Sequence, residues 1–192
     1  MGTTQPIRKK EELKQFMDYY RNTRPNARNY VLITFGLHTA LRISDILNLS
    51  WRDVYDFEKS RFRNHIFVRE DKTGKENIVA LNTHLKDSLE LYKRLRNPSS
   101  KDYIFTKTTN FSRPLSRSQA FRIIKKAAIE TLHDPHISCH SLRKTFGYHA
   151  WKQGVPPALL MEIYNHSSYA ITKRYLGIAQ DERDSIFMDI DF

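Results

Sequence analysis

The amino-acid sequence predicts an α+β fold that is mainly α-helical and contains a small antiparallel β-sheet. Two patterns support this class: apolar residues recur with the helical period along most of the chain, whereas residues 62–81 have strand composition around a turn. A length of 192 residues with 40% hydrophobic residues is sufficient for one ordinary core. We therefore expect one domain, residues 1–179, followed by an acidic and apolar tail, residues 180–192.

Three helices are predicted in the first fifty residues. Asn26 is placed to cap the second of them, which continues to Leu37 and is apolar nearly all round, as expected of a central helix. A short third helix follows Arg42 and ends near Leu49, and residues 51–53 are interpreted as a loop. The first helix is indicated by an apolar stripe at helical spacing, which consists of Leu13, Phe16, Met17 and Tyr20.

One β-hairpin is predicted after these helices. Residues 62–69 and 77–81 have strand composition, and residues 71–74 (DKTG) between them have turn chemistry. No other clear hairpin is indicated in the chain.

Helices fill the remainder of the domain. One runs over residues 83–95, a second opens with Ser116 and Gln119 as a capping box, a third is capped by Ser138, and a fourth begins at Pro156. The second of these helices is expected to bury an apolar face made of Phe121, Ile124 and Ala128. Its other face is basic and is expected to bind DNA through Arg117, Arg122, Lys125 and Lys126.

The charge of the chain points to a polyanionic partner. Lysine and arginine exceed acidic residues by 11, and the excess is uneven, because the last twelve residues hold five acids and one arginine. Residues 1–180 therefore carry a net charge of +15. Such a surface is typical of a nucleic-acid-binding protein, although an evenly basic protein without such a partner is the alternative on charge alone.

Several other classes of protein and site are excluded. The chain has neither an apolar run of about twenty residues nor an apolar signal segment, so we expect no membrane-spanning or secreted protein. Cys139 is the only cysteine, which excludes an internal disulfide and favours an intracellular compartment. No metal site is predicted, because His133 and His136 flank a stiff proline in what reads as a loop.

Pairs of polar residues at helical spacing are candidates for an anion site. Arg42 has Asp45 three residues later, which can hold the guanidinium in place, and His140 has Arg143 three residues later at the start of a predicted helix. Each pair alone is more often an ordinary surface feature than a site. His166 and Tyr175 follow nine residues apart, and a tyrosine in such a stretch is normally a core or rim residue.

The ordered set of these residues resembles the tyrosine recombinase or phage-integrase family. TALRISDILNLSWRDV resembles the family's first arginine box, REDKTGKENIVAL its hairpin lysine, and HSLRKTFGYHAWKQGV with NHSSYAITKRYL its second arginine box and nucleophile. The resemblance runs from about Pro6 to Gly177. It implies the catalytic-domain fold of the family, which is similar to the core of type IB topoisomerases.

The resemblance also assigns roles to individual residues. It implies that Arg42 and Arg143 grip the scissile phosphate, that Tyr175 attacks it, and that His140 and His166 hydrogen-bond and transfer protons. Lys72 at the hairpin turn is implied to be the general acid, and Lys75 is a competing candidate that is also expected to contact DNA. No metal, ATP or other cofactor is implied.

Two departures from the family pattern are visible. The family usually has Gly-His where this chain has Asn165-His166, and since asparagine tolerates a left-handed conformation we expect the local geometry to survive. The chain also has no room for the N-terminal core-binding domain of larger members. It therefore resembles short single-domain recombinases, such as those that invert promoter segments, or an excised catalytic domain.

The leading functional hypothesis is a site-specific DNA recombinase that works through a covalent 3′-phosphotyrosyl intermediate. Its expected partners are double-stranded DNA, further copies of the chain in a tetramer on two sites, and an accessory DNA-bending protein, in the cytoplasm of a bacterium at the nucleoid. The acidic tail is expected to dock on a neighbouring subunit, and a frayed end is its alternative. The competing functions are a nicking-closing activity like that of topoisomerase IB and a non-catalytic DNA-binding regulator.

Overall fold

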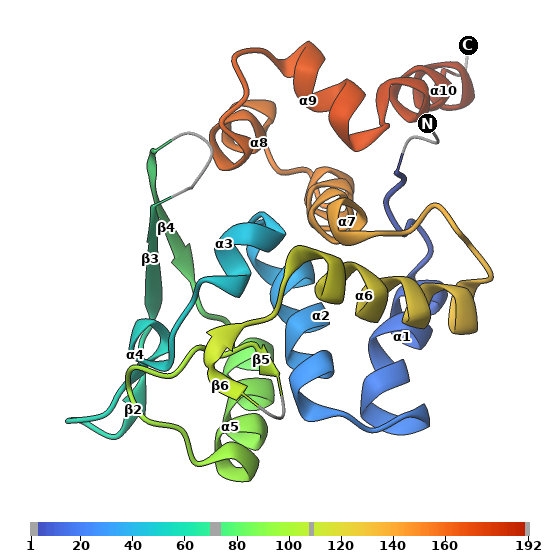
Figure 1. The fold of residues 1–192 in the computed structure, drawn as a ribbon. Helices are drawn as coiled ribbons and strands as arrows, with labels where there is room; N and C mark the ends of the chain where they lie inside the picture. The colour runs from blue at the N-terminus through green and yellow to red at the C-terminus, as the bar shows by residue number, and fades with distance from the viewer. Residues whose placement is uncertain (1–3, 70–73, 108–109, 191–192) are drawn as a thin grey trace.

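The computed structural model describes residues 4–69, 74–107 and 110–190, and it shows helices around one central helix with small β-ladders at one end (Figure 1). The first half contains α1 (Lys10–Asp18), the π-helical turn η1 (Tyr19–Thr23), α2 (Ala27–Thr39), α3 (Ile43–Leu47), α4 (Trp51–Val54) and α5 (Thr83–Arg96). The second half contains α6 (Arg117–Leu132), α7 (Cys139–Lys152), α8 (Pro157–Tyr164), α9 (Tyr169–Leu176) and α10 (Ala179–Asp189). The predicted α+β class, mainly helical with small antiparallel sheets, is confirmed.

The central helix of the fold is α2, as predicted from its apolar composition. Asn26 caps it by accepting a hydrogen bond from the backbone N–H of Asn29, and its residues 31–37 are all buried. It packs against α5 on one side and α7 on the other. It ends at Ala40, whose left-handed backbone (φ 52°) turns the chain toward Arg42.

Helix α7 packs at close range on both of its sides. A Cβ atom added at Gly36 of α2 would lie 2.5 Å from Cδ1 of Leu142 on α7. A Cβ atom added at Gly147 of α7 would lie 2.5 Å from the hydroxyl of Tyr164 and 2.6 Å from Cδ2 of Leu176. Glycine therefore allows α2, α7 and the helices α8 and α9 to approach one another, and this approach brings residues from distant parts of the sequence together.

The hairpin of strands β3 (His65–Arg69) and β4 (Glu76–Ala80) is confirmed, with Phe67 opposite Ile78 in an antiparallel register. Its predicted turn residues 71–73, including Lys72, lie outside the described residues. The prediction of one clear hairpin is wrong, because two further antiparallel ladders form. They join β1 (Tyr55–Asp56) to β2 (Arg61–Phe62) and β5 (Thr106–Lys107) to β6 (Asn110–Pro114). Strands β1, β2 and β5 have two residues each. They are too short for the alternation of apolar and polar residues that is typical of a strand to be visible in the sequence.

Two local predictions are corrected by the structure. Residues 51–53 form helix α4 instead of a loop, because Ser50 and Asp53 make a capping box and Trp51 is completely buried. Phe121 is 43% exposed and does not belong to the buried face of α6. That face consists of Ala120, Ile124, Ala127 and Ala128. The capping box of Ser116 and Gln119 at the start of α6 is confirmed.

Helices α8, α9 and α10 cover one end of the molecule, next to α7 (Figure 1). Leu160, Tyr164, Leu176 and Ile178 are buried there together with Ala40 and Tyr148. Within the part of the chain that the structure describes, no helix is long and apolar enough to cross a membrane.

Candidate active site

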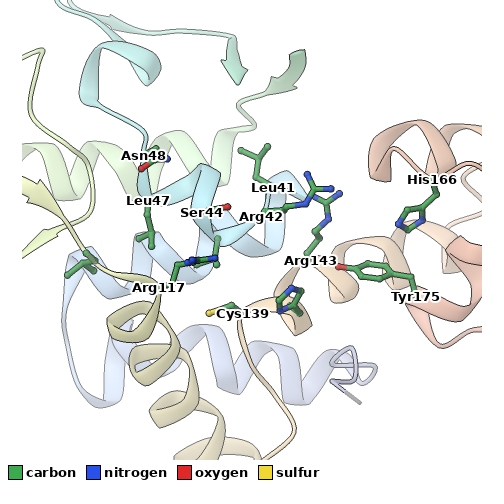
Figure 2. Close-up of a pocket in the computed structure, with 13 residues that line it drawn as sticks. Leu41, Arg42, Ser44, Leu47, Asn48, Arg117, Cys139, Arg143, His166 and Tyr175 are labelled. Carbon is green, nitrogen blue, oxygen red and sulfur yellow. The ribbon is translucent and has the colours of Figure 1, made fainter. Parts of the chain in front are cut away.

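A cavity of about 800 Å³ lies where the α2–α3 junction, the N-terminal ends of α6 and α7, and α9 meet (Figure 2). Among the residues that line it are six that the sequence singles out: Arg42, Arg117, His140, Arg143, His166 and Tyr175. They are spread over residues 42–175, and the packing of α2 against α7 brings Arg42 together with the residues of the second half of the chain. Lys72 lies outside the described residues, so its place relative to the cavity stays a prediction.

Arg42 enters the cavity from the residue before α3. It is the N-cap of that helix, with an extended backbone (φ −72°, ψ 149°). The prediction that Arg42 and Asp45 share a helical face is therefore wrong, because Arg42 precedes the helix. Asp45 is 3% exposed and lies in the first turn of α3, where a carboxylate is favoured by the free N–H groups and by the helix dipole. Its supporting role toward Arg42 stays a prediction.

Arg143 is held in the wall of the cavity by its own helix and by Tyr164. Its side chain is 4% exposed, and its guanidinium carbon lies 4.8 Å from the centre of the Tyr164 ring. The Tyr164 hydroxyl donates a 2.6 Å hydrogen bond to the backbone carbonyl of Arg143. A guanidinium fixed in this way can present a planar fork to an anion without first being ordered.

The N-terminus of α7 faces the same cavity. His140 is exposed in the first turn of this helix, and the turn is closed by the hydrogen bond from the Ser138 backbone N–H to the Ser141 hydroxyl. Cys139 also lines the cavity, but burial raises the pKa of its thiol to about 11. A thiol with this pKa is a poor nucleophile at neutral pH.

The hydroxyl of Tyr175 points toward Arg143 (Figure 2). Burial raises the pKa of this phenol, whereas the positive charges of Arg143 and Arg42 and a hydrogen bond with Arg143 act in the opposite direction. The Tyr175 ring also contacts the rings of Tyr164 and His166, with centroids 5.4 Å and 5.3 Å away. These contacts fix the ring, so the phenol oxygen is the part of the side chain that faces the two arginines.

His166 is oriented by a residue that the sequence does not single out. Its Nδ1 atom lies 3.1 Å from the hydroxyl of Thr172, which is completely buried on α9. Asn165 has a left-handed backbone (φ 54°), as expected of the residue that replaces glycine there. No sequence signal indicates Thr172, because the contact depends on how α9 folds back after residue 166.

The remaining predicted DNA contacts lie at or beyond the edge of the cavity. Lys75 approaches the cavity from the hairpin, with its Nζ atom 3.5 Å from Oδ1 of Asn165. Arg122 and Lys126 are exposed on α6, whereas Lys125 donates a hydrogen bond to the backbone carbonyl of Pro135. Among the described residues, no three His, Cys, Asp or Glu side chains come together as metal ligands would.

The ionisation of His166 gives a measurable pH dependence. Burial and the charges of Arg143 and Arg42 hold the pKa of His166 below its usual value. The unfolded chain therefore binds this proton more readily than the folded protein, so stability that is present above pH 6.5 is lost as the pH falls below it. We expect the melting temperature of the wild type to fall further between pH 7.5 and pH 5.5 than that of His166→Gln.

The control for this experiment is His133→Gln, which removes an exposed histidine outside the cavity. Parallel curves for the wild type and His166→Gln would contradict the assignment of the pH dependence to His166.

Comparison with known proteins gives one consistent result. The model of the Phage integrase family matches residues 8–182. The "Probable integrase/recombinase YoeC" of Bacillus subtilis is 39% identical over 181 residues, which are 94% of this chain and 93% of that protein. The "Type 1 fimbriae regulatory protein FimE" of Escherichia coli K12 is 31% identical over 78% of this chain and 74% of its own length.

Solved structures show the same fold. XerA recombinase has a TM-score of 0.76 at 21% identity, with 98% of this chain and 66% of that chain covered. XerH recombinase, in a structure bound to its palindromic difH substrate, has a TM-score of 0.72 at 20% identity and 55% coverage of its own chain. The chain thus spans about half to two thirds of these proteins.

Proposed function

The chain belongs to the phage integrase family of tyrosine recombinases, and from this membership we propose that it cleaves and rejoins DNA at specific sites with Tyr175 as the nucleophile. The observation that supports these roles most directly is the convergence of Arg42, Arg143, His166 and Tyr175 on one cavity, with His140 at its edge. The family model covers nine tenths of the chain, so the activity is proposed for the whole described fold.

The proposed first step forms a bond between the Tyr175 oxygen and a DNA phosphorus atom and breaks the bond from phosphorus to the 5′ oxygen. The phosphotyrosyl ester stores the energy of the broken phosphodiester, so attack by a 5′-hydroxyl can rejoin the strand without ATP. The tyrosine proton goes to a base, for which His140 is the candidate, and the leaving 5′ oxygen takes a proton from Lys72 or from Lys75.

Arg42 and Arg143 are proposed to stabilise the negative charge that develops on the phosphate. Each guanidinium can direct two N–H groups at non-bridging oxygens, and such fixed donors cost no reorganisation during the reaction. The same charges oppose the burial that raises the Tyr175 pKa. The arginines therefore favour both the transition state and the ionised nucleophile.

Double-stranded DNA is the proposed substrate, and we propose a tetramer on two sites with an accessory DNA-bending protein. The net charge of +11 and the exposed Arg117, Arg122 and Lys126 on α6 support DNA binding beside the cavity. A protein that acts on bacterial or phage DNA works in the cytoplasm at the nucleoid. In this proposal residues 1–179 form the catalytic domain.

A covalent-trapping experiment tests the proposal. The wild type is incubated with nicked duplexes that carry candidate sites, without metal or ATP, and a denaturing gel is searched for protein joined to a DNA 3′ end. An adduct that requires Tyr175 supports the recombinase. DNA binding without any adduct would contradict it and favour a non-catalytic regulator, whereas relaxation of supercoiled DNA without exchange between sites would favour the nicking-closing alternative.

The C-terminal tail is proposed to join subunits. Helix α10 is tied to the domain in its first turn, where Asp181 pairs with Arg8 and Glu182 pairs with Lys173. Beyond that turn its apolar side chains are exposed, namely Ile186 (58%), Phe187 (80%), Met188 (83%) and Ile190 (54%). A helix end that is apolar and acidic suits a groove on a basic neighbour of the same sequence.

Deletion of residues 185–192 is therefore expected to reduce recombination between two sites at least tenfold and to change the affinity for a single site less than twofold. This deletion leaves the contacts of Asp181 and Glu182 in place, whereas deletion from residue 180 would remove them. Recombination and single-site gel-shift assays on the same protein provide the comparison. Unchanged recombination would show that the tail is a solvated end.

A further inference from the structure

Residues 4–8, here termed the N-terminal clasp, contact α7 and the end of α9. These two helices carry Arg143 and Tyr175 of the candidate site. Ile7 is 2% exposed and packs in a core with Leu142 of α7. Its backbone N–H donates a 2.9 Å hydrogen bond to the hydroxyl of Thr145, and its carbonyl oxygen lies 3.0 Å from Nε2 of His149. The clasp is therefore fixed to α7 over more than one turn.

Arg8 connects this fixed segment to the end of α9. Its guanidinium donates a 2.8 Å hydrogen bond to the carbonyl of Gly177 and a second 2.8 Å bond to Oδ1 of Asp181 on α10. The guanidinium also lies 5.2 Å from the centre of the Tyr148 ring on α7. Gly177 is the C-cap of α9, two residues after Tyr175, so one side chain bridges α7 and the junction that follows the proposed nucleophile.

A second bridge runs through Lys144. The ammonium group of Lys144 donates a 2.6 Å hydrogen bond to the carbonyl of Thr4 in the clasp, and it lies 5.2 Å from the centre of the Tyr175 ring. A cation over an aromatic ring is attracted to it. The clasp thus holds Lys144 on one side of the Tyr175 ring, while His166 and Tyr164 contact the ring elsewhere.

We propose that the N-terminal clasp is a positioning device that sets Tyr175 for attack, with Arg8 as its principal residue. The inference rests on the proposed function, because it assigns the clasp a role in the tyrosine's reaction. The ion pair of Arg8 with Asp181 is partly exposed and would add little stability by itself. Its effect is geometric: a nucleophile displaced by about 1 Å can lose a hundredfold in rate.

The test compares Arg8→Ala with Lys9→Ala, which removes the same charge from the next residue. Lys9 is exposed and pairs only with Glu12 on α1 among the described contacts, so it is a matched control. For both variants we would measure the rate of adduct formation at DNA concentrations that saturate the protein, the Kd for the same DNA, and the melting temperature. Asp181→Asn, which removes the negative charge from one of the two hydrogen-bond acceptors of Arg8 and keeps an amide oxygen in its place, is a milder third variant.

Arg8→Ala is expected to form the adduct about tenfold more slowly than Lys9→Ala at saturating DNA, with a Kd within twofold of that control. Asp181→Asn is expected to be slowed two- to threefold, and it continues the test if Arg8→Ala does not fold. Rates of adduct formation equal to the control in every folded variant would overturn the proposed role of the clasp. A loss of rate fully explained by weaker DNA binding would overturn it as well. A wild type that forms no adduct contradicts the proposed function itself, and the clasp's role with it.

Discussion

Tyr175→Phe is expected to bind DNA with the affinity of the wild type and to form no covalent adduct at any time. The substitution removes one oxygen atom from the cavity and leaves the ring, which contacts Tyr164 and His166, in place. Phenylalanine has no atom that can attack phosphorus, so the loss should be complete instead of partial. The measurement is the trapping gel with nicked duplexes, accompanied by a gel shift on the same DNA.

Tyr30→Phe is the matched control for this variant. It removes a hydroxyl from a tyrosine of α2 whose ring lies near Arg21, and it should retain the wild-type adduct. An adduct of wild-type intensity in Tyr175→Phe would assign the nucleophile to another residue and overturn the proposed mechanism.

Arg143→Lys is expected to slow adduct formation by about a hundred- to a thousandfold while changing the affinity for DNA by less than about threefold. Lysine keeps the positive charge, which the polyanion attracts, but it lacks the planar fork that can bind two phosphate oxygens. The Arg143 side chain is 4% exposed and lies against the Tyr164 ring, so a shorter ammonium group would not reach the same position. Single-turnover kinetics at saturating protein separate this loss of rate from weaker binding.

Arg174→Lys provides the control, because Arg174 is exposed on α9 next to the nucleophile in sequence. It should behave like the wild type. If Arg143→Lys kept a rate within threefold of the wild type, the fork geometry would not matter, and Arg143 would serve only as a charge.

The sequence indicates those parts of the fold that local chemistry decides. Asn26 and Ser116 cap their helices through side-chain hydrogen bonds with the third residue that follows, and this spacing is visible in the sequence. Ser50 and Asp53 have the same spacing, but residues 51–53 contain only one apolar side chain and so show no helical periodicity. The prediction that Phe121 is buried is wrong, because helical periodicity identifies an apolar stripe but does not decide how wide the buried face is.

The candidate site could be predicted only in part. The order of the residues and their flanking sequences indicate five of them, and the structure brings these five to one cavity: Arg42, His140, Arg143, His166 and Tyr175. Thr172, which contacts His166, and Arg8, which contacts Gly177, have no local signal. Each acts across a distance that only the packed fold defines, so a single sequence does not indicate either residue.

The close approach of α2 to α7 at Gly36 has a consequence for the protein during its synthesis. Arg42 and Arg143 lie about a hundred residues apart in the sequence, and the segment between them contains α4, α5 and α6. A chain that has left the ribosome only as far as α6 carries Arg42 but neither Arg143 nor the candidate nucleophile Tyr175. An incomplete chain therefore cannot hold a phosphate with both Arg42 and Arg143, so the proposed cleavage requires the whole domain to have been synthesised and folded.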